Sequence, residues 1–81
     1  MRYEVVGFNR NKYGRMEGCD IYCITDHLHQ AVDFAKDSIR RGQFDAIEIH
    51  EINPDRDELL RVWYMGKTLT LESEVIPNEP V

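Results

Sequence analysis

Cysteine is scarce in this sequence and no long apolar run is present, and each shortage excludes a class of protein. Two cysteines in 81 residues are too few for a disulfide framework, so we expect a reduced protein in the cytoplasm. No stretch reaches the roughly 18 apolar residues of a membrane-spanning helix. Residues 1–4, Met-Arg-Tyr-Glu, lack the apolar segment of a signal peptide. We therefore expect no membrane contact.

Basic side chains are also few. Ten lysines and arginines stand against 15 aspartates and glutamates, which makes the formal net charge −5 at pH 7. Residues 1–18 contain four basic and two acidic side chains, whereas residues 43–81 contain three basic and nine acidic ones. Binding to a phosphate backbone depends on clustered lysine and arginine, so the composition disfavours nucleic acid as a partner.

The sequence contains none of the short motifs that organise common active sites. There is no serine nucleophile elbow, no phosphate-binding glycine loop and no metal-binding helix motif. The only serines, Ser38 and Ser73, are expected on the polar side of a helix and in a C-terminal tail. A chain of 81 residues also leaves little interior for a deep pocket. We therefore predict a protein that is not an enzyme and has no cofactor or small-molecule substrate.

Four residues look like zinc ligands, but their spacing opposes a shared metal. In a strand, Cys19 and Cys23 would lie about 13 Å apart, whereas zinc requires sulfur atoms within about 4 Å of each other. His27 and His29 are two residues apart at a predicted helix start and would point to different sides. We therefore predict no metal site.

What the sequence does contain is a simple succession of strands, turns and one helix. Extended segments are predicted at residues 3–8, 18–25, 44–52 and 59–65, with a helix over 26–41 and a short edge strand at 68–71. This β-β-α-β-β order predicts an α+β fold. One helix packs on one face of a four-stranded antiparallel sheet, and a short fifth strand is an option. We assign residues 1–71 to a single domain and residues 72–81 to an acidic, flexible tail.

The helix has the clearest pattern. Apolar side chains recur at three- and four-residue spacing from Leu28 to Ile39, which is typical of an amphipathic helix. Thr25 or Asp26 can cap its first turn, and Gly42 can adopt the left-handed conformation that ends it. One helix covers only one face of a sheet, so the other face must meet water, a partner or another segment of the chain.

Side-chain alternation along the last two long strands predicts which residues form the uncovered face. Successive side chains of a strand point to opposite faces, so one set faces the helix and the other faces away. We expect the helix-facing set to be Ile47, Ile49, Leu60, Val62 and Tyr64, and the outward set to be Glu48, His50, Trp63 and Met65. A contiguous apolar patch on a monomer usually marks an interaction surface.

We therefore predict a protein-binding module that docks onto a partner, or onto a second copy as a homodimer, through the face around Trp63. Tryptophan, tyrosine, methionine and arginine are enriched at the centres of interfaces. The predicted partner-binding residues are Trp63, Met65, Tyr22, Phe8, His50 and Arg61. An alternative stays open, in which the C-terminal segment around Leu71, Val75 and Ile76 covers this face itself.

Two further functions remain as alternatives. In the first, the protein is a small acidic inhibitor of the kind that phages encode, and it competes for the nucleic-acid-binding surface of a target. The acidic patch for this role is Asp55, Asp57 and Glu58. In the second, the basic tip of the first hairpin contacts RNA. The residues of that tip are Arg10, Lys12 and Arg15.

Overall fold

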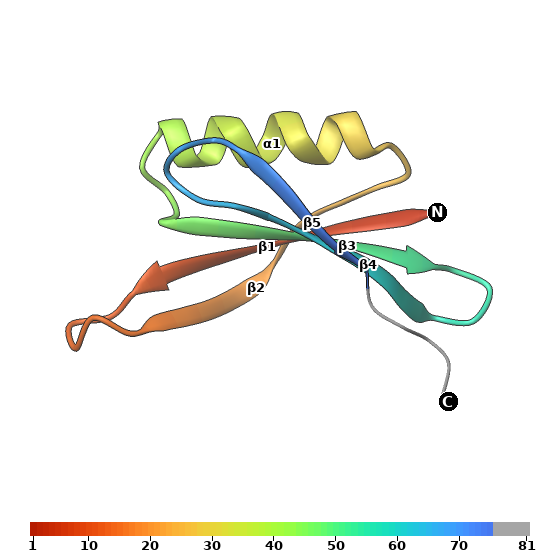
Figure 1. Cartoon of the computed structure of the whole chain (residues 1–81), viewed down its shortest axis with the longest axis horizontal. Helices are drawn as coiled ribbons and strands as arrows, with labels where there is room; N and C mark the ends of the chain where they lie inside the picture. The colour runs from red at the N-terminus through yellow and green to blue at the C-terminus, as the bar shows by residue number, and fades with distance from the viewer. Residues whose placement is uncertain (76–81) are drawn as a thin grey trace.

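A single helix lies across one face of a five-stranded antiparallel sheet (Figure 1). The computed structural model describes residues 1–75, except for the side chains of Cys19 and Asp20. The predicted α+β class with one helix is confirmed, but the sheet has five strands rather than four. Along the chain the elements are β1 (Arg2–Arg10), β2 (Met16–Thr25), α1 (Leu28–Arg40), β3 (Ala46–Asn53), β4 (Glu58–Met65) and β5 (Leu71–Val75).

The helix connects β2 and β3, two strands that are not neighbours in the sheet. The strands lie in the order β2-β1-β3-β4-β5, and each neighbouring pair is antiparallel. The chain leaves β2 at one edge, passes through α1 and returns as β3, so β1 lies between the two strands that the helix connects. The helix packs mainly on β1, β2 and β3.

The helix begins one residue later than a cap at Asp26 allows and two residues later than a cap at Thr25 allows. His27 precedes the first turn in an extended conformation and makes no side-chain capping hydrogen bond. Its backbone N–H donates instead to Oγ1 of Thr25, at 3.2 Å. At the other end Gly42 has φ 74°, the left-handed conformation that glycine adopts without steric cost. The predicted stop is confirmed, whereas neither Thr25 nor Asp26 is the N-cap.

Small side chains let the helix approach the sheet closely. The buried residues of α1 are Ala31, Ala35 and Ser38, which lie on one face at four- and three-residue spacing. Only 2% of Ser38 is exposed, so the expectation that it lies on the polar side of the helix is wrong. A serine at this position occupies little more space than alanine, which suits a tight contact between helix and sheet.

The pairing of β3 with β4 decides which side chains the helix covers. Ile49 lies directly opposite Trp63, and Ile47 lies directly opposite Met65. Directly opposite residues of an antiparallel pair share a face, and all four are buried. The expectation that Trp63 and Met65 face away from the helix is therefore wrong, because with Ile47 and Ile49 they form the core.

A bulge in β4 causes this difference. The register shifts by one residue just before Ile52, which leaves Leu60 as an extra residue on β4. A shift of one residue sends the following side chains to the opposite face of the sheet. In an unbulged hairpin Ile49 would lie opposite Val62, as the alternation predicts. The bulge places Trp63 there instead.

Gly7 makes room for an aromatic ring in the core. Phe44 is 8% exposed, and a Cβ atom at position 7 would overlap its ring. Tyr22 packs against Phe44 with ring centroids 4.7 Å apart. A register shift in the pairing of β1 with β2 leaves Tyr22 between the partners of Val5 and Val6. This irregularity brings Tyr22 to the helix side of the sheet, beside Phe44.

The sheet extends further toward the C-terminus than the sequence predicts. β5 pairs with β4 as far as Val75, so the first four residues of the predicted tail belong to the sheet. The predicted edge strand at 68–71 is instead mostly a connection, in which the N–H of Leu69 donates to the carbonyl of Gly66 at 3.0 Å. Leu69 has φ 60° and packs against the core. Residues 76–81, to which the rest of the tail prediction applies, lie outside the described residues.

Candidate protein-binding face

The sheet face that turns away from α1 combines apolar and acidic side chains, and we call it the open face. Its residues alternate along the strands with those that face the helix, and cross-strand pairs join them from edge to edge. Ala46 and Ile52, opposite Phe8 and Arg2, lie on the same face but are buried. The open face consists of Glu4, Val6 and Phe8 of β1, Ile21 and Ile24 of β2, Glu48 and His50 of β3, Val62 and Tyr64 of β4, and Glu72 and Glu74 of β5.

Several large apolar side chains on this face are in contact with solvent. Ile24 is 62% exposed, Ile21 is 48% exposed and Tyr64 is 44% exposed. Val6 on β1 and Val62 on β4 are half-buried. The helix lies on the other side of the sheet (Figure 1). The exposed apolar side chains thus form two groups, one on β1 and β2 and one on β4, with Glu48 and His50 of β3 between them. Exposed apolar groups of this kind are typical of an interaction surface.

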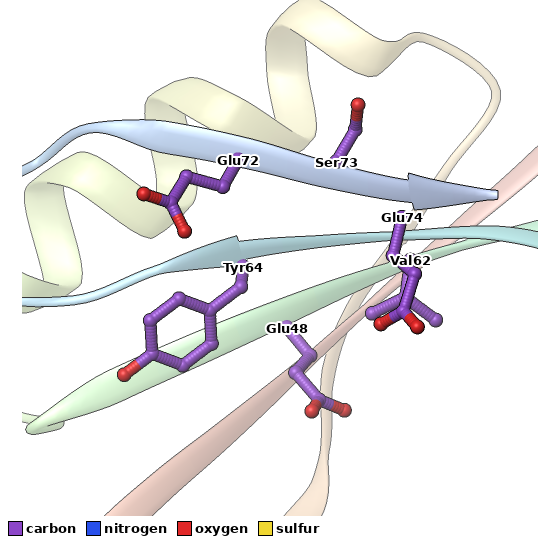
Figure 2. A pocket seen from close by; sticks show the side chains of 6 residues that line it. All are labelled: Glu48, Val62, Tyr64, Glu72, Ser73 and Glu74. Atoms are coloured by element: carbon purple, nitrogen blue, oxygen red, sulfur yellow. The ribbon is translucent and has the colours of Figure 1, made fainter.

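Carboxylates surround a shallow hollow at the β5 side of this face, and we call it the acidic hollow. Its volume is about 280 Å³, and it is lined by Glu48, Val62, Tyr64, Glu72, Ser73 and Glu74. Figure 2 shows the side chains of the three glutamates and of Tyr64 on the same side of the sheet, whereas the Ser73 hydroxyl points the other way, toward α1. The hollow therefore has an apolar and aromatic base with negative charge around it.

The charges of the hollow are only partly balanced within the described chain. Oε1 of Glu48 lies 2.9 Å from Nε2 of His50. Among residues 1–75, the ion pairs include none with Glu72 or Glu74. Arg2 does not supply the missing cation, because its guanidinium pairs with Glu4 and Asp57 at the other end of the sheet. Two carboxylates thus remain available to a cation from outside.

Most residues predicted to bind a partner lie on the helix side instead. The indole of Trp63 packs against Tyr3 with ring centroids 6.0 Å apart, and the guanidinium of Arg61 lies 5.2 Å from the centre of the indole. Met65 is fully buried. These positions correct the prediction of a docking surface around Trp63. Among the other predicted residues, Phe8 and His50 lie on the open face, and Tyr22 lies on the helix side.

The predicted acidic patch lies in the turn between β3 and β4, away from the acidic hollow. The carboxylate of Asp57 is already paired, because its Oδ1 lies 2.6 Å from the Arg2 guanidinium. This hydrogen bond is the main reason that the pKa of Arg2 is raised. Sequence reasoning missed Glu72 and Glu74 because it assigned them to a tail. The signal that could have placed them is the alternation of residues 71–75, Leu-Glu-Ser-Glu-Val.

The first hairpin extends beyond the sheet as a basic arm, which we define as residues 9–17. The pairing of β1 with β3 stops at Phe8 and Ala46, whereas β1 and β2 continue as a pair as far as Arg10 and Met16. In Figure 1 the arm leaves the sheet toward the side opposite α1. Its base is held by Asp45, whose Oδ2 accepts a hydrogen bond from the Arg10 backbone N–H at 2.8 Å.

The tip of the basic arm is ordered by Asn11. Its Oδ1 accepts hydrogen bonds from the backbone N–H groups of Tyr13 and Arg15, at 2.9 and 3.0 Å. Gly14, with φ 79°, supplies the left-handed residue that closes the turn. Lys12 lies over the Tyr13 ring, 5.1 Å from its centre, and 76% of Tyr13 is exposed. The tip therefore presents an aromatic ring and two cations on a fixed backbone.

Two of the residues considered as zinc ligands lie together. The rings of His27 and His29 are exposed at the start of α1 with centroids 5.6 Å apart, so the expectation that they point to different sides is wrong. Cys23 is half-buried opposite Val5 beneath the helix, and the side chain of Cys19 lies outside the described residues. Among the described side chains, no group of three His, Cys, Asp or Glu is placed to hold a metal ion. Within the described part of the chain, no helix is long and apolar enough to cross a membrane.

No family model, no curated protein and no solved structure matches the chain. The structural evidence on function therefore comes from the open face, the acidic hollow and the basic arm.

Proposed function

We propose that this protein is a non-enzymatic protein-binding module that docks its partner on the open face. The observation that carries the proposal is the acidic hollow, in which Val62 and Tyr64 lie beside two carboxylates of β5, Glu72 and Glu74, that no cation of the described chain neutralises. The apolar groups gain free energy when a partner removes them from water, at about 25 cal/mol per Å². The carboxylates select which partner does so.

The partner that fits this face is a basic segment of protein with at least one apolar or aromatic side chain. Arginine or lysine can pair with Glu72 and Glu74, and its aliphatic stem can lie along Val62. Charge complementarity of this kind mainly sets specificity and the rate of association, whereas the apolar contacts supply affinity. An acidic or neutral segment would leave the carboxylates desolvated and unpaired, which is costly.

The test uses a synthetic peptide in which arginine alternates with valine, and a matched peptide with glutamate in place of arginine. We expect the isotope-labelled protein to bind the first peptide and not the second, with the largest amide shifts at Val62, Tyr64 and Glu74. The double variant Glu72→Lys/Glu74→Lys should weaken binding about tenfold or more, because it reverses both unpaired charges.

The matched control is Asp26→Lys/Asp33→Lys, which changes the net charge by the same amount at exposed positions near and on α1. This control should change affinity far less than the hollow variant does. Equal loss of affinity in both variants would show that only net charge matters, and shifts confined to the helix side would show that the open face is not the docking surface.

A second candidate function follows from the charge of the same face. An acidic surface that binds a basic segment can block a nucleic-acid-binding site, so the protein would act as an inhibitor. Glu72 and Glu74 support this role better than the turn acids do, because Asp57 is already paired. The discriminating measurement is whether the protein displaces a labelled oligonucleotide from a basic target, and whether Glu72→Lys/Glu74→Lys abolishes the displacement.

A further inference from the structure

We infer that the basic segment that docks on the open face is the basic arm of a second copy of this chain. The inference rests on the proposed docking face and adds the identity of its occupant. Each copy would place its arm on the acidic hollow of the other, so that two identical contacts close a symmetric dimer.

The two contact regions of one chain have opposite charge. Among the described residues, the ion pairs include none with Lys12 or Arg15 on the arm and none with Glu72 or Glu74 at the hollow. A single chain thus presents two cations without an ion pair on the arm and two carboxylates without one at the hollow. Bringing the two regions together in a second copy satisfies both at once, whereas each copy alone satisfies neither.

The arm also has the shape that insertion requires. It extends past the last β1–β3 pair, so its tip can reach another molecule without a change in the sheet. The hydrogen bonds of Asn11 fix the tip before binding, which lowers the conformational entropy lost on docking. Tyr13, 76% exposed, can then pack on Val62 and Tyr64 at the base of the hollow.

Other ways of pairing two copies are less favourable. Two open faces in direct contact with their β5 strands facing would bring Glu72 and Glu74 close to the same residues of the second copy, and like charges repel there. Pairing through the β2 edge meets two register shifts of β2 against β1, opposite Val5/Val6 and opposite Val6/Phe8, which interrupt a regular ladder. Pairing through the β5 edge involves only five residues, two of them glutamates. Docking of the arm on the hollow is the arrangement that joins opposite charges.

The test is an exchange of charge between the two regions. The arm variant is Lys12→Glu/Arg15→Glu, and the hollow variant is Glu72→Lys/Glu74→Lys. All four positions are exposed, so circular dichroism should show both variants folded. We expect the unmodified protein to sediment as a dimer and each variant alone to sediment as a monomer, with self-association weakened about tenfold or more.

The decisive sample is the equimolar mixture of the two variants. In that mixture each acidic arm meets a basic hollow and each basic arm meets an acidic hollow, so a heterodimer should form again. The inference fails if the unmodified protein stays monomeric at the highest attainable concentration, if either variant alone remains dimeric, or if the mixture stays monomeric.

Failure here is separable from failure of the proposed function. If the unmodified protein is monomeric but still binds the arginine–valine peptide on the open face, the docking face stands and its occupant is not a second copy. If the arm variant loses affinity for a short RNA while its self-association is unchanged, the arm is a nucleic-acid contact and this inference is overturned.

Discussion

The two faces of the sheet are made by alternate residues of the same strands, yet one face packs against α1 and the other does not. On the helix side, Ala31, Ala35 and Gly7 are small enough for α1 and Phe44 to lie directly on the strands. On the open face, apolar side chains alternate with glutamates, and the helix lies on the opposite side of the sheet. The single helix therefore covers only one of the two faces, and we propose that the other binds a partner.

The largest expected effect compares neighbouring residues of β4 that point to opposite faces. Trp63→Ala should lower the free energy of unfolding by about 3–5 kcal/mol, because it removes a large buried side chain from the core. Tyr64→Ala, on the open face, should cost about 1 kcal/mol or less, because the ring is 44% exposed. Urea unfolding measures both. Equal costs would mean that the two faces do not differ as described.

A smaller effect tests how closely the core approaches the backbone of β1. Gly7→Ala places a methyl group where the Phe44 ring lies, so we expect a loss of about 1–3 kcal/mol from overpacking. Gly66→Ala is the control, because a Cβ there meets the Tyr64 hydroxyl at 3.4 Å, close to ordinary contact. The double variant Gly7→Ala/Phe44→Leu should recover part of the loss if the clash is the cause. No recovery would point instead to the backbone of β1.

On the open face, charge reversal should affect stability little while it affects binding strongly. Glu72→Lys/Glu74→Lys should change the free energy of unfolding by about 0.5 kcal/mol or less, because both side chains are exposed and have no ion pair among the described residues. Thermal unfolding of the variant beside the unmodified protein checks this. A large loss of stability would mean that these glutamates stabilise the pairing of β5 with the sheet, and that they are not simply exposed charges available to a partner.

The sequence predicts the elements of this fold better than their register. The spacing between Leu28 and Ile39 predicts the helix, and alternating segments with turn residues between them predict the β1–β2 and β3–β4 hairpins. The orientation of Trp63 does not follow from the same pattern, because it depends on whether Leu60 is paired or bulged. A bulge adds one residue to a strand, and no particular residue type indicates where it occurs. Every side chain that follows the bulge on that strand then points to the opposite face of the sheet.

The candidate site was harder to predict than the core for the same reason. The basic arm is continuous in the sequence, so Arg10, Lys12 and Arg15 could be identified as a group. The acidic hollow joins β3, β4 and β5, and it exists only once Glu72 and Glu74 are in the sheet. Short segments rich in glutamate are typical of disordered tails, and only pairing with β4 makes this one a strand.

The smallest expected effect concerns the link between the arm and the rest of the sheet. The Arg10 backbone N–H donates to the carboxylate of Asp45, and this hydrogen bond, with Lys67 nearby, holds the pKa of Asp45 below its usual value. A lowered pKa in the folded state contributes stability above the unfolded pKa, and that contribution is lost as the pH falls through the folded pKa. The arm should therefore loosen in acid, and a lower protection factor of the Arg10 amide, relative to the intrinsic exchange rate at the same pH, would report this.

Asp45→Asn separates this link from general acid effects. The variant should exchange the Arg10 amide faster at neutral pH and lose the part of the pH dependence that Asp45 provides. Asp33→Asn is the control, because Asp33 is exposed on α1 and takes part in none of the ion pairs of residues 1–75. If exchange at Arg10 responds equally to both substitutions, the arm is not held by Asp45. If exchange responds only to Asp45→Asn, the order of the arm depends on the hydrogen bond between the Arg10 N–H and Asp45, which lies next to the last β1–β3 pair, Phe8 and Ala46.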